Sequence, residues 1–85
     1  MNLVDELLIL TSRGYEIKFR NGLLGDEDLE IIVHYADEEK GIAHRIVHTI
    51  NREILNDSAD ENERYVNETL DIMVMDMERR KAYYP

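Results

Sequence analysis

The chain has 85 residues, and its 10 Lys and Arg against 19 Asp and Glu give a formal net charge of −9. A chain this short holds one hydrophobic core, and a hydrophobic content of 44% is enough to build it, so we expect a single domain over residues 1–85. The excess of acid disfavours direct binding to nucleic acid and to anionic membranes, while the absence of cysteine excludes disulfides, thiolate metal sites and thiol nucleophiles.

The first predicted elements are a short helix and a β-hairpin. Apolar residues recur at helical spacing from Leu3 to Leu10, and Gly14 is a typical stop signal. Residues 15–20 then alternate apolar and charged side chains, which predicts a half-buried strand. Its inward residues are predicted to be Tyr15, Ile17 and Phe19. The second strand is predicted over 29–35, with one face formed by Leu29, Ile31, Val33 and Tyr35.

The segment from Asp37 to Asn56 fits two different structures. Isoleucine at positions 42, 46, 50 and 54 fits an amphipathic helix that starts at the acids 37–39. Gly41 and the β-branched residues of 46–50 instead favour a hairpin loop followed by a third strand over 42–48. In that case a short helix would begin near Thr49 and cover residues 50–55.

A long helix is predicted near the end of the chain. Ser58 and Glu61 have the spacing of a capping box, and cations at 79–81 suit the negative end of a helix. One apolar stripe is formed by Val66, Leu70, Met73 and Met77. Met73, Met75 and Met77, together with Ile72 and Val74, make the helix apolar on more than one side. A helix of this kind suits a small structural or adaptor protein that dimerises, or binds a partner, through its Met-rich surface.

No pattern in the sequence predicts an enzyme or a bound cofactor. The loop that contains Gly22 and Gly25 has no basic residue to hold phosphate, and neither serine lies in a recognisable nucleophile motif. His44 and His48 are four residues apart and would share a face in a helix or a strand, where His34 could neighbour them in a sheet. The adjacent Arg45 opposes a cation, so we predict polar surface positions and no metal site.

The acidic residues fall into two groups that contain no Lys or Arg. The first group spans 26–39 and consists of Asp26, Glu27, Asp28, Glu30, Asp37, Glu38 and Glu39. The second spans 57–63 and consists of Asp57, Asp60, Glu61 and Glu63. Carboxylates presented on a folded surface reproduce the charge of a phosphate backbone, and they would fit the basic groove of a nucleic-acid-binding protein. The alternative is that the acids only keep the protein soluble.

Several segments together resemble small proteins of Gram-positive phages and prophages. The opening Met1-Asn2-Leu3-Val4-Asp5 and the later Gly14-Tyr15-Glu16-Ile17-Lys18-Phe19 are similar to the start of these proteins. Arg45-Ile46-Val47-His48-Thr49 resembles their third strand, and residues 65–78 resemble their closing helix. This layout, size and acidity are similar to those of the DNA-mimicking anti-CRISPR inhibitors of the type II CRISPR nuclease.

The resemblance implies a fold, a partner and a binding site. The implied fold is α+β: an N-terminal helix, a three-stranded antiparallel sheet, and one short and one long C-terminal helix, with a two-stranded hairpin and three helices as the alternative. The implied partner is a basic nucleic-acid-binding protein, the type II CRISPR nuclease, whose DNA and PAM site would be blocked. The inhibitor would act in the host bacterial cytoplasm, as a monomer or a homodimer. The residues that match the contacting positions are Asp37, Glu38, Glu39, Asp57, Asp60, Glu61, Glu63 and Tyr65.

Overall fold

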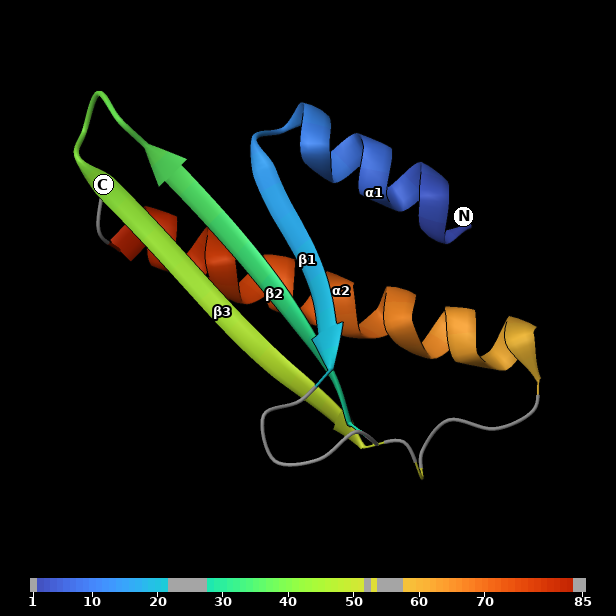
Figure 1. The fold of residues 1–85 in the computed structure, drawn as a ribbon. Coiled ribbons are helices and arrows are strands. Elements are labelled where there is room, and N and C mark those ends of the chain that lie inside the picture. Colours follow the sequence, from blue (N-terminus) through green and yellow to red (C-terminus); the bar gives the residue numbers. More distant parts are fainter. Residues whose placement is uncertain (1, 22–27, 52, 54–57, 84–85) are drawn as a thin grey trace.

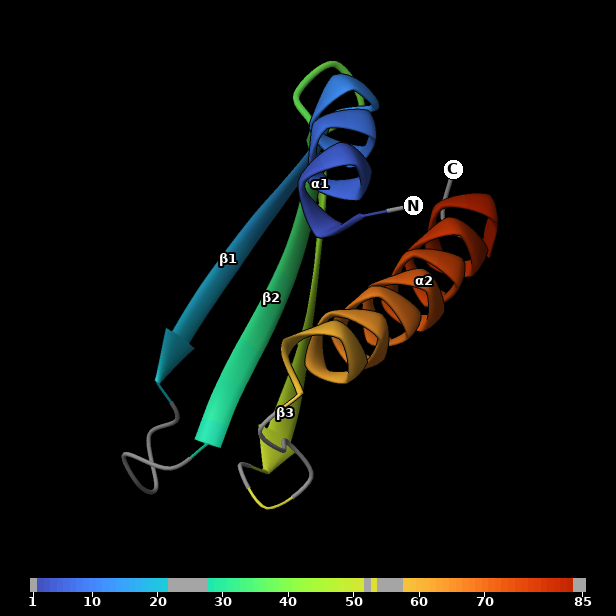
Figure 2. The same ribbon diagram turned by 90° about the vertical axis from the view of Figure 1, so that its right-hand side faces the viewer.

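The fold is an antiparallel sheet with two helices on one face. The computed structural model describes residues 2–21, 28–51, 53 and 58–83. Its elements in chain order are α1 (Leu3–Ser12), β1 (Tyr15–Asn21), β2 (Asp28–Asp37), β3 (Ile42–Asn51) and α2 (Ala59–Tyr83). The strands lie in the order β1-β2-β3, and both helices cover the same side of the sheet (Figure 1 and Figure 2). The predicted α+β fold with three strands is therefore confirmed.

The register of β3 resolves the ambiguous segment in favour of the strand. β2 and β3 pair along their whole length, from Asp37 opposite Ile42 to Asp28 opposite Asn51. The prediction that a short helix begins near Thr49 is wrong, because the continuing ladder with β2 holds residues 49–51 in the sheet. The rest of that predicted helix covers residues 52–55, of which 52, 54 and 55 lie outside the described residues.

The core lies between the inner face of the sheet and α2. Alternation along β2 buries Ile31 and Val33 completely, and the stripe predicted on α2 faces them. The buried hydrophobic residues of α2 are Val66, Leu70, Met73 and Met77. Tyr15 is buried as predicted, whereas Phe19 keeps 39% of its surface exposed near the end of the edge strand β1. The helix α1 packs at the start of β1 (Figure 2), and Tyr15 of β1 also reaches α2 through a hydrogen bond to Glu78.

Hydrogen bonds at the starts of the two helices cap each helix and join the helices to each other. The Asn2 side chain accepts a hydrogen bond from the backbone of Asp5 at 2.8 Å and so caps α1. The Ser58 hydroxyl accepts one from the backbone of Glu61 at 3.3 Å, which confirms the predicted cap of α2. Glu63 of α2 also accepts a hydrogen bond from the backbone of Leu3 at 2.6 Å, so the N-terminal ends of the two helices are held together.

Candidate functional site

The first group of predicted site residues lies in the turn between β2 and β3. The backbone of Lys40 donates to the Asp37 carboxylate at 3.2 Å, and the backbone of Gly41 donates to the Glu38 carbonyl at 3.3 Å. Gly41 has a φ of +66°, a conformation that suits glycine and closes the turn. These contacts leave Glu38 and Glu39 exposed at the tip, so the turn presents two carboxylates from a defined backbone.

The second group lies at the start of α2. Asp60 and Glu61 are exposed in the first helical turn, where the helix dipole stabilises acids. Glu63 and Tyr65 differ from them. Glu63 is partly buried and bonded to Leu3, and Tyr65 packs against the hydrophobic core. Asp57 lies outside the described residues.

The predicted site residues of the β2–β3 turn, Asp37, Glu38 and Glu39, do not meet those at the start of α2 within one chain. Figure 1 shows the β2–β3 turn at the end of the molecule where α2 ends, whereas α2 begins at the opposite end. Figure 2 shows the same separation from the side. A single partner surface would therefore have to extend along the length of the molecule to contact both groups.

A third acidic feature, which the linear sequence did not indicate, lies between the two helices. Glu6 of α1 is only 8% exposed and lines the same depression of about 260 Å3 as Asp71 of α2. Burial, followed by the hydrogen bond and the negative charge of Asp71, raises the pKa of the Glu6 carboxyl to about 7. Two helical carboxyl groups 65 positions apart are brought together here by tertiary packing, so only the folded chain reveals them.

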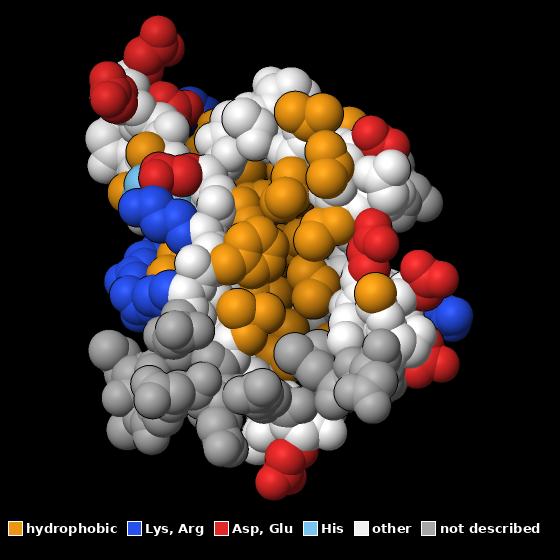
Figure 3. Space-filling view, turned by 45° about the vertical axis from the view of Figure 1, so that its right-hand side comes forward, with side chains coloured by type: hydrophobic (Ala, Val, Ile, Leu, Met, Phe, Trp, Pro, Cys, Tyr) orange, Lys and Arg blue, Asp and Glu red, His pale blue; other side chains and the backbone are white. Residues whose placement is uncertain are grey.

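Basic side chains gather on the outer face of the sheet. Lys18, Arg20 and Arg45 project from the outer face of the sheet, which the helices leave uncovered, and they line a depression of about 460 Å3. Glu16 and Glu30 pair with Lys18 and Arg20 on that face, at 3.3 and 2.5 Å. Figure 3 shows Lys and Arg side chains gathered on the left with acidic side chains beside them, mostly acidic charged side chains on the right, and a strip of hydrophobic side chains in between.

The register separates the histidines. His44 and His48 of β3 share the inner face of the sheet, whereas His34 pairs with Arg45 and lies on the outer face. The expectation that His34 could neighbour the other two is wrong, because adjacent positions of a strand point to opposite faces. In the described part of the chain, no group of three or more His, Cys, Asp or Glu side chains is arranged to hold a metal ion.

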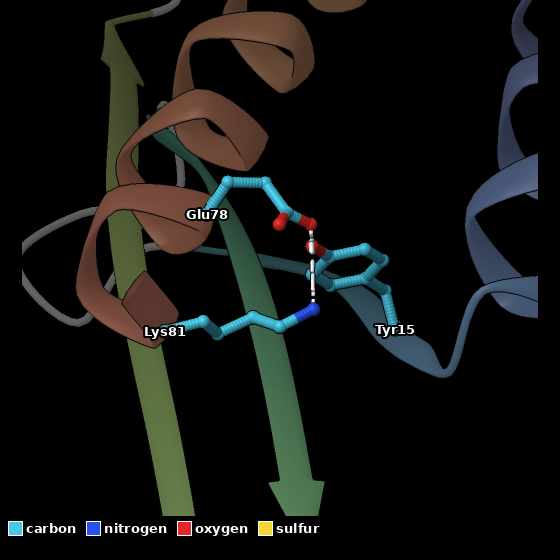
Figure 4. Close-up of polar contacts among 3 residues, drawn as sticks. All are labelled: Tyr15, Glu78 and Lys81. Carbon is cyan, nitrogen blue, oxygen red and sulfur yellow. Dashed lines mark hydrogen bonds and ion pairs between the residues drawn. The ribbon is translucent and has the colours of Figure 1, made fainter. Parts of the chain in front are cut away.

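A polar cluster joins the end of α2 to the sheet (Figure 4). The Tyr15 hydroxyl donates to the Glu78 carboxylate, and the Lys81 ammonium donates to the same carboxylate at 3.4 Å. The ammonium also lies 4.0 Å from the centre of the Tyr35 ring, a cation–π contact. The hydrogen bond from Tyr15 is the main reason that the pKa of Glu78 is lowered. Because all three polar groups bond to one another, this cluster has a structural role.

We expect the Tyr15→Phe variant to lose about 1.5 kcal/mol of unfolding free energy, because a charge-assisted hydrogen bond disappears while the ring remains. Urea denaturation followed by circular dichroism measures the change. Tyr65→Phe is the matched control, since Tyr65 lies on the same helix as Glu78 and its ring packs against the core. Equal loss in both variants would contradict a role for the cluster.

Comparison with protein-family models, curated proteins and solved structures finds no match for this chain. Neither of the two described helices combines the length and the apolar character that crossing a bilayer requires.

Proposed function

We propose that this chain is a phage-encoded inhibitor that binds a basic, nucleic-acid-handling host protein, with its carboxylates in the place of DNA phosphates. The partner that the sequence resemblance favours is the type II CRISPR nuclease, at the site that reads PAM DNA. The observation that carries the proposal is the exposure of Glu38, Glu39, Asp60 and Glu61 on a closed turn and on a capped helix. In this proposal the chain acts in the cytoplasm of the bacterial host.

The contacts follow from the chemistry of a DNA-binding groove. Arg and Lys side chains that would hold phosphates instead bind carboxylates through charge-assisted hydrogen bonds, which are stronger than neutral ones. A net charge of −9 also accelerates the encounter with a basic groove at low ionic strength. Because the turn and the helix start are ordered before binding, little conformational entropy is lost when they dock.

The experiment measures how strongly the chain competes with PAM-containing DNA for the guide-loaded nuclease, by fluorescence anisotropy of labelled DNA. One variant carries Glu38→Gln and Glu39→Gln, and a second carries Asp60→Asn and Glu61→Gln. Gln and Asn replace a charge-assisted hydrogen bond of about 1.5–3 kcal/mol by a neutral one of about 0.5–1.5 kcal/mol. Two such changes should cost about 2 kcal/mol and raise the inhibitory concentration by about thirtyfold. Testing the two ends separately identifies which of them enters the groove.

The control variant carries Glu16→Gln and Asp76→Asn, which remove two charges from positions outside both groups. Its inhibition should stay within about twofold of the wild type. An equal loss in all three variants would mean that only net charge matters. Unhindered DNA binding in the presence of the wild-type chain would reject the CRISPR nuclease as the partner.

A further inference from the structure

One side of α2 is exposed although it is apolar at its centre. Ile72 is 61% and Met75 is 56% exposed, on the side of the helix away from the core. Glu68 and Arg79, both exposed, flank them along the same side. The spacing 68, 72, 75, 79 repeats every three or four residues, so these four side chains form one stripe, which we call the outer stripe.

The apolar part of the outer stripe continues onto α1. Ile9 of α1 is 44% exposed and lines a groove of about 390 Å3 together with Met75. Three large apolar side chains, Ile9, Ile72 and Met75, are thus exposed across the helical layer, which is a pattern that marks interaction surfaces.

The order of charges along the outer stripe indicates what covers it. Read from the N-terminal end, the stripe is acidic, apolar, apolar and basic. A second copy that runs in the opposite direction presents the same stripe in reverse, with its basic residue opposite the acidic one. The helix as a whole follows the same order, since its first turn holds Asp60 and Glu61 and its last turn holds Arg80 and Lys81.

We propose that two copies of this chain associate through the outer stripe, with their α2 helices antiparallel about a twofold axis. Ile72 of each copy lies opposite Met75 of the other, and Glu68 of each copy pairs with Arg79 of the other. A twofold interface uses every contact twice, so a self-complementary stripe is what it requires. The interface is centred on one helix and is smaller than those of most stable complexes, so the expected dissociation constant is micromolar.

The present partner of Arg79 does not prevent this arrangement. Arg79 pairs with Asp76 on its own helix at 3.4 Å, and 74% of its side chain and 49% of the Asp76 side chain are exposed. An exposed pair of this kind contributes little to stability, so Arg79 exchanges one carboxylate for another at low cost.

The dimer would also change where the acidic groups lie. In one chain, the β2–β3 turn and the start of α2 lie at opposite ends (Figure 1). Antiparallel α2 helices bring the turn of one copy and the α2 start of its partner to the same end of the dimer. That these neighbouring acidic groups bind one partner rests on the proposed function, whereas the dimer itself does not. Competition with DNA tests the function, and sedimentation tests the dimer.

Sedimentation velocity over a range of concentrations tests the dimer. The wild type should shift from the 10.0 kDa chain mass towards twice that value as its concentration rises. Glu68→Arg and Arg79→Glu should each weaken association by about tenfold or more, because each change places like charges opposite one another twice. The double variant, with Glu68→Arg and Arg79→Glu together, should restore association to near the wild-type strength.

Glu39→Arg is the matched control, since it makes the same change of charge in the exposed β2–β3 turn and should leave association unchanged. Circular dichroism establishes that every variant is folded. Recovery in the double variant supports the proposed pairing. A wild type that stays monomeric up to millimolar concentration, or a dimer that neither single variant weakens, overturns the proposal. Neither result bears on whether the chain competes with DNA.

Discussion

Replacing Leu70 with alanine is expected to lower the unfolding free energy by about 3 kcal/mol, the largest effect of any substitution considered for this chain. Leu70 is completely buried at the middle of α2, among the side chains that face the inner side of the sheet. Removing its branched end leaves a cavity that the strands cannot close, because Ile31 and Val33 are held by pairing on both sides of β2. Urea denaturation monitored by circular dichroism measures the loss.

Leu8→Ala is the control for this prediction. It makes the same chemical change on α1, where Leu8 is 64% exposed, and it should alter the unfolding free energy by less than about 0.5 kcal/mol. If Leu70→Ala leaves too little folded protein to measure, Leu70→Met keeps the volume and should lose less than about 1.5 kcal/mol. Similar losses for Leu70→Ala and Leu8→Ala would contradict the position of the core.

The Glu6→Gln variant is expected to be more stable than the wild type above neutral pH, by about 2 kcal/mol. The pKa of Glu6 is about 7 in the folded chain and 4.5 as its ordinary value, so ionisation is harder in the folded state. Stability that depends on protonated Glu6 is fully present below pH 4.5 and is lost as the pH rises through 7. A shift of this size corresponds to about 3 kcal/mol, and solvent near Asp71 reduces the effect.

Measuring the unfolding free energy of both proteins from pH 4 to pH 8 tests this prediction. The difference between Glu6→Gln and the wild type should be small at pH 4 and should grow across the interval from 4.5 to 7. Asp5→Asn removes the same charge from the adjacent, exposed position and shows how much of the change comes from net charge alone. A constant difference at every pH would exclude a titrating Glu6.

If the helical layer also forms a dimer interface, the ionisation of Glu6 would change the strength of dimerisation as well as the stability of the single chain. Glu6 lines the same groove as Ile9 and Met75, and Asp71 and Arg13 face that groove from α2 and α1. Ionised Glu6 adds negative charge beside Asp71 in this groove, so it would also weaken association of two copies there. The unfolding free energies of the wild type and Glu6→Gln should therefore be measured at concentrations where the chain is monomeric. Under those conditions, the pH effect belongs to the single chain.

Local patterns of the sequence predicted most of the elements. The alternation in residues 15–20 and 29–35 places apolar side chains on one face, and both strands form as expected. Ser58 and Glu61 predicted the start of α2, and the predicted stripe from Val66 to Met77 is buried. These features depend on residues close to one another in the chain, so they can be recognised without knowledge of the fold.

The segment 42–51 shows where such patterns fail. Isoleucine at 42, 46 and 50 has a spacing of four, which places residues on one face of a helix and, because four is even, on one face of a strand as well. Pairing with β2 decides between the two, and a local pattern does not contain that information. The same pairing overturned the short helix predicted from Thr49.

The α+β class, the hairpin, the long closing helix and the acidic character of the chain follow from periodicity and charge, which are properties of neighbouring residues. Which distant side chains meet depends on how the elements pack in three dimensions. The tertiary structure pairs Glu6 with Asp71, joins Tyr15 to Glu78, and places the acidic turn and the start of α2 at opposite ends. Those outcomes depend on how α1 and α2 pack on one side of the sheet, and the packing is settled by burial of the whole core.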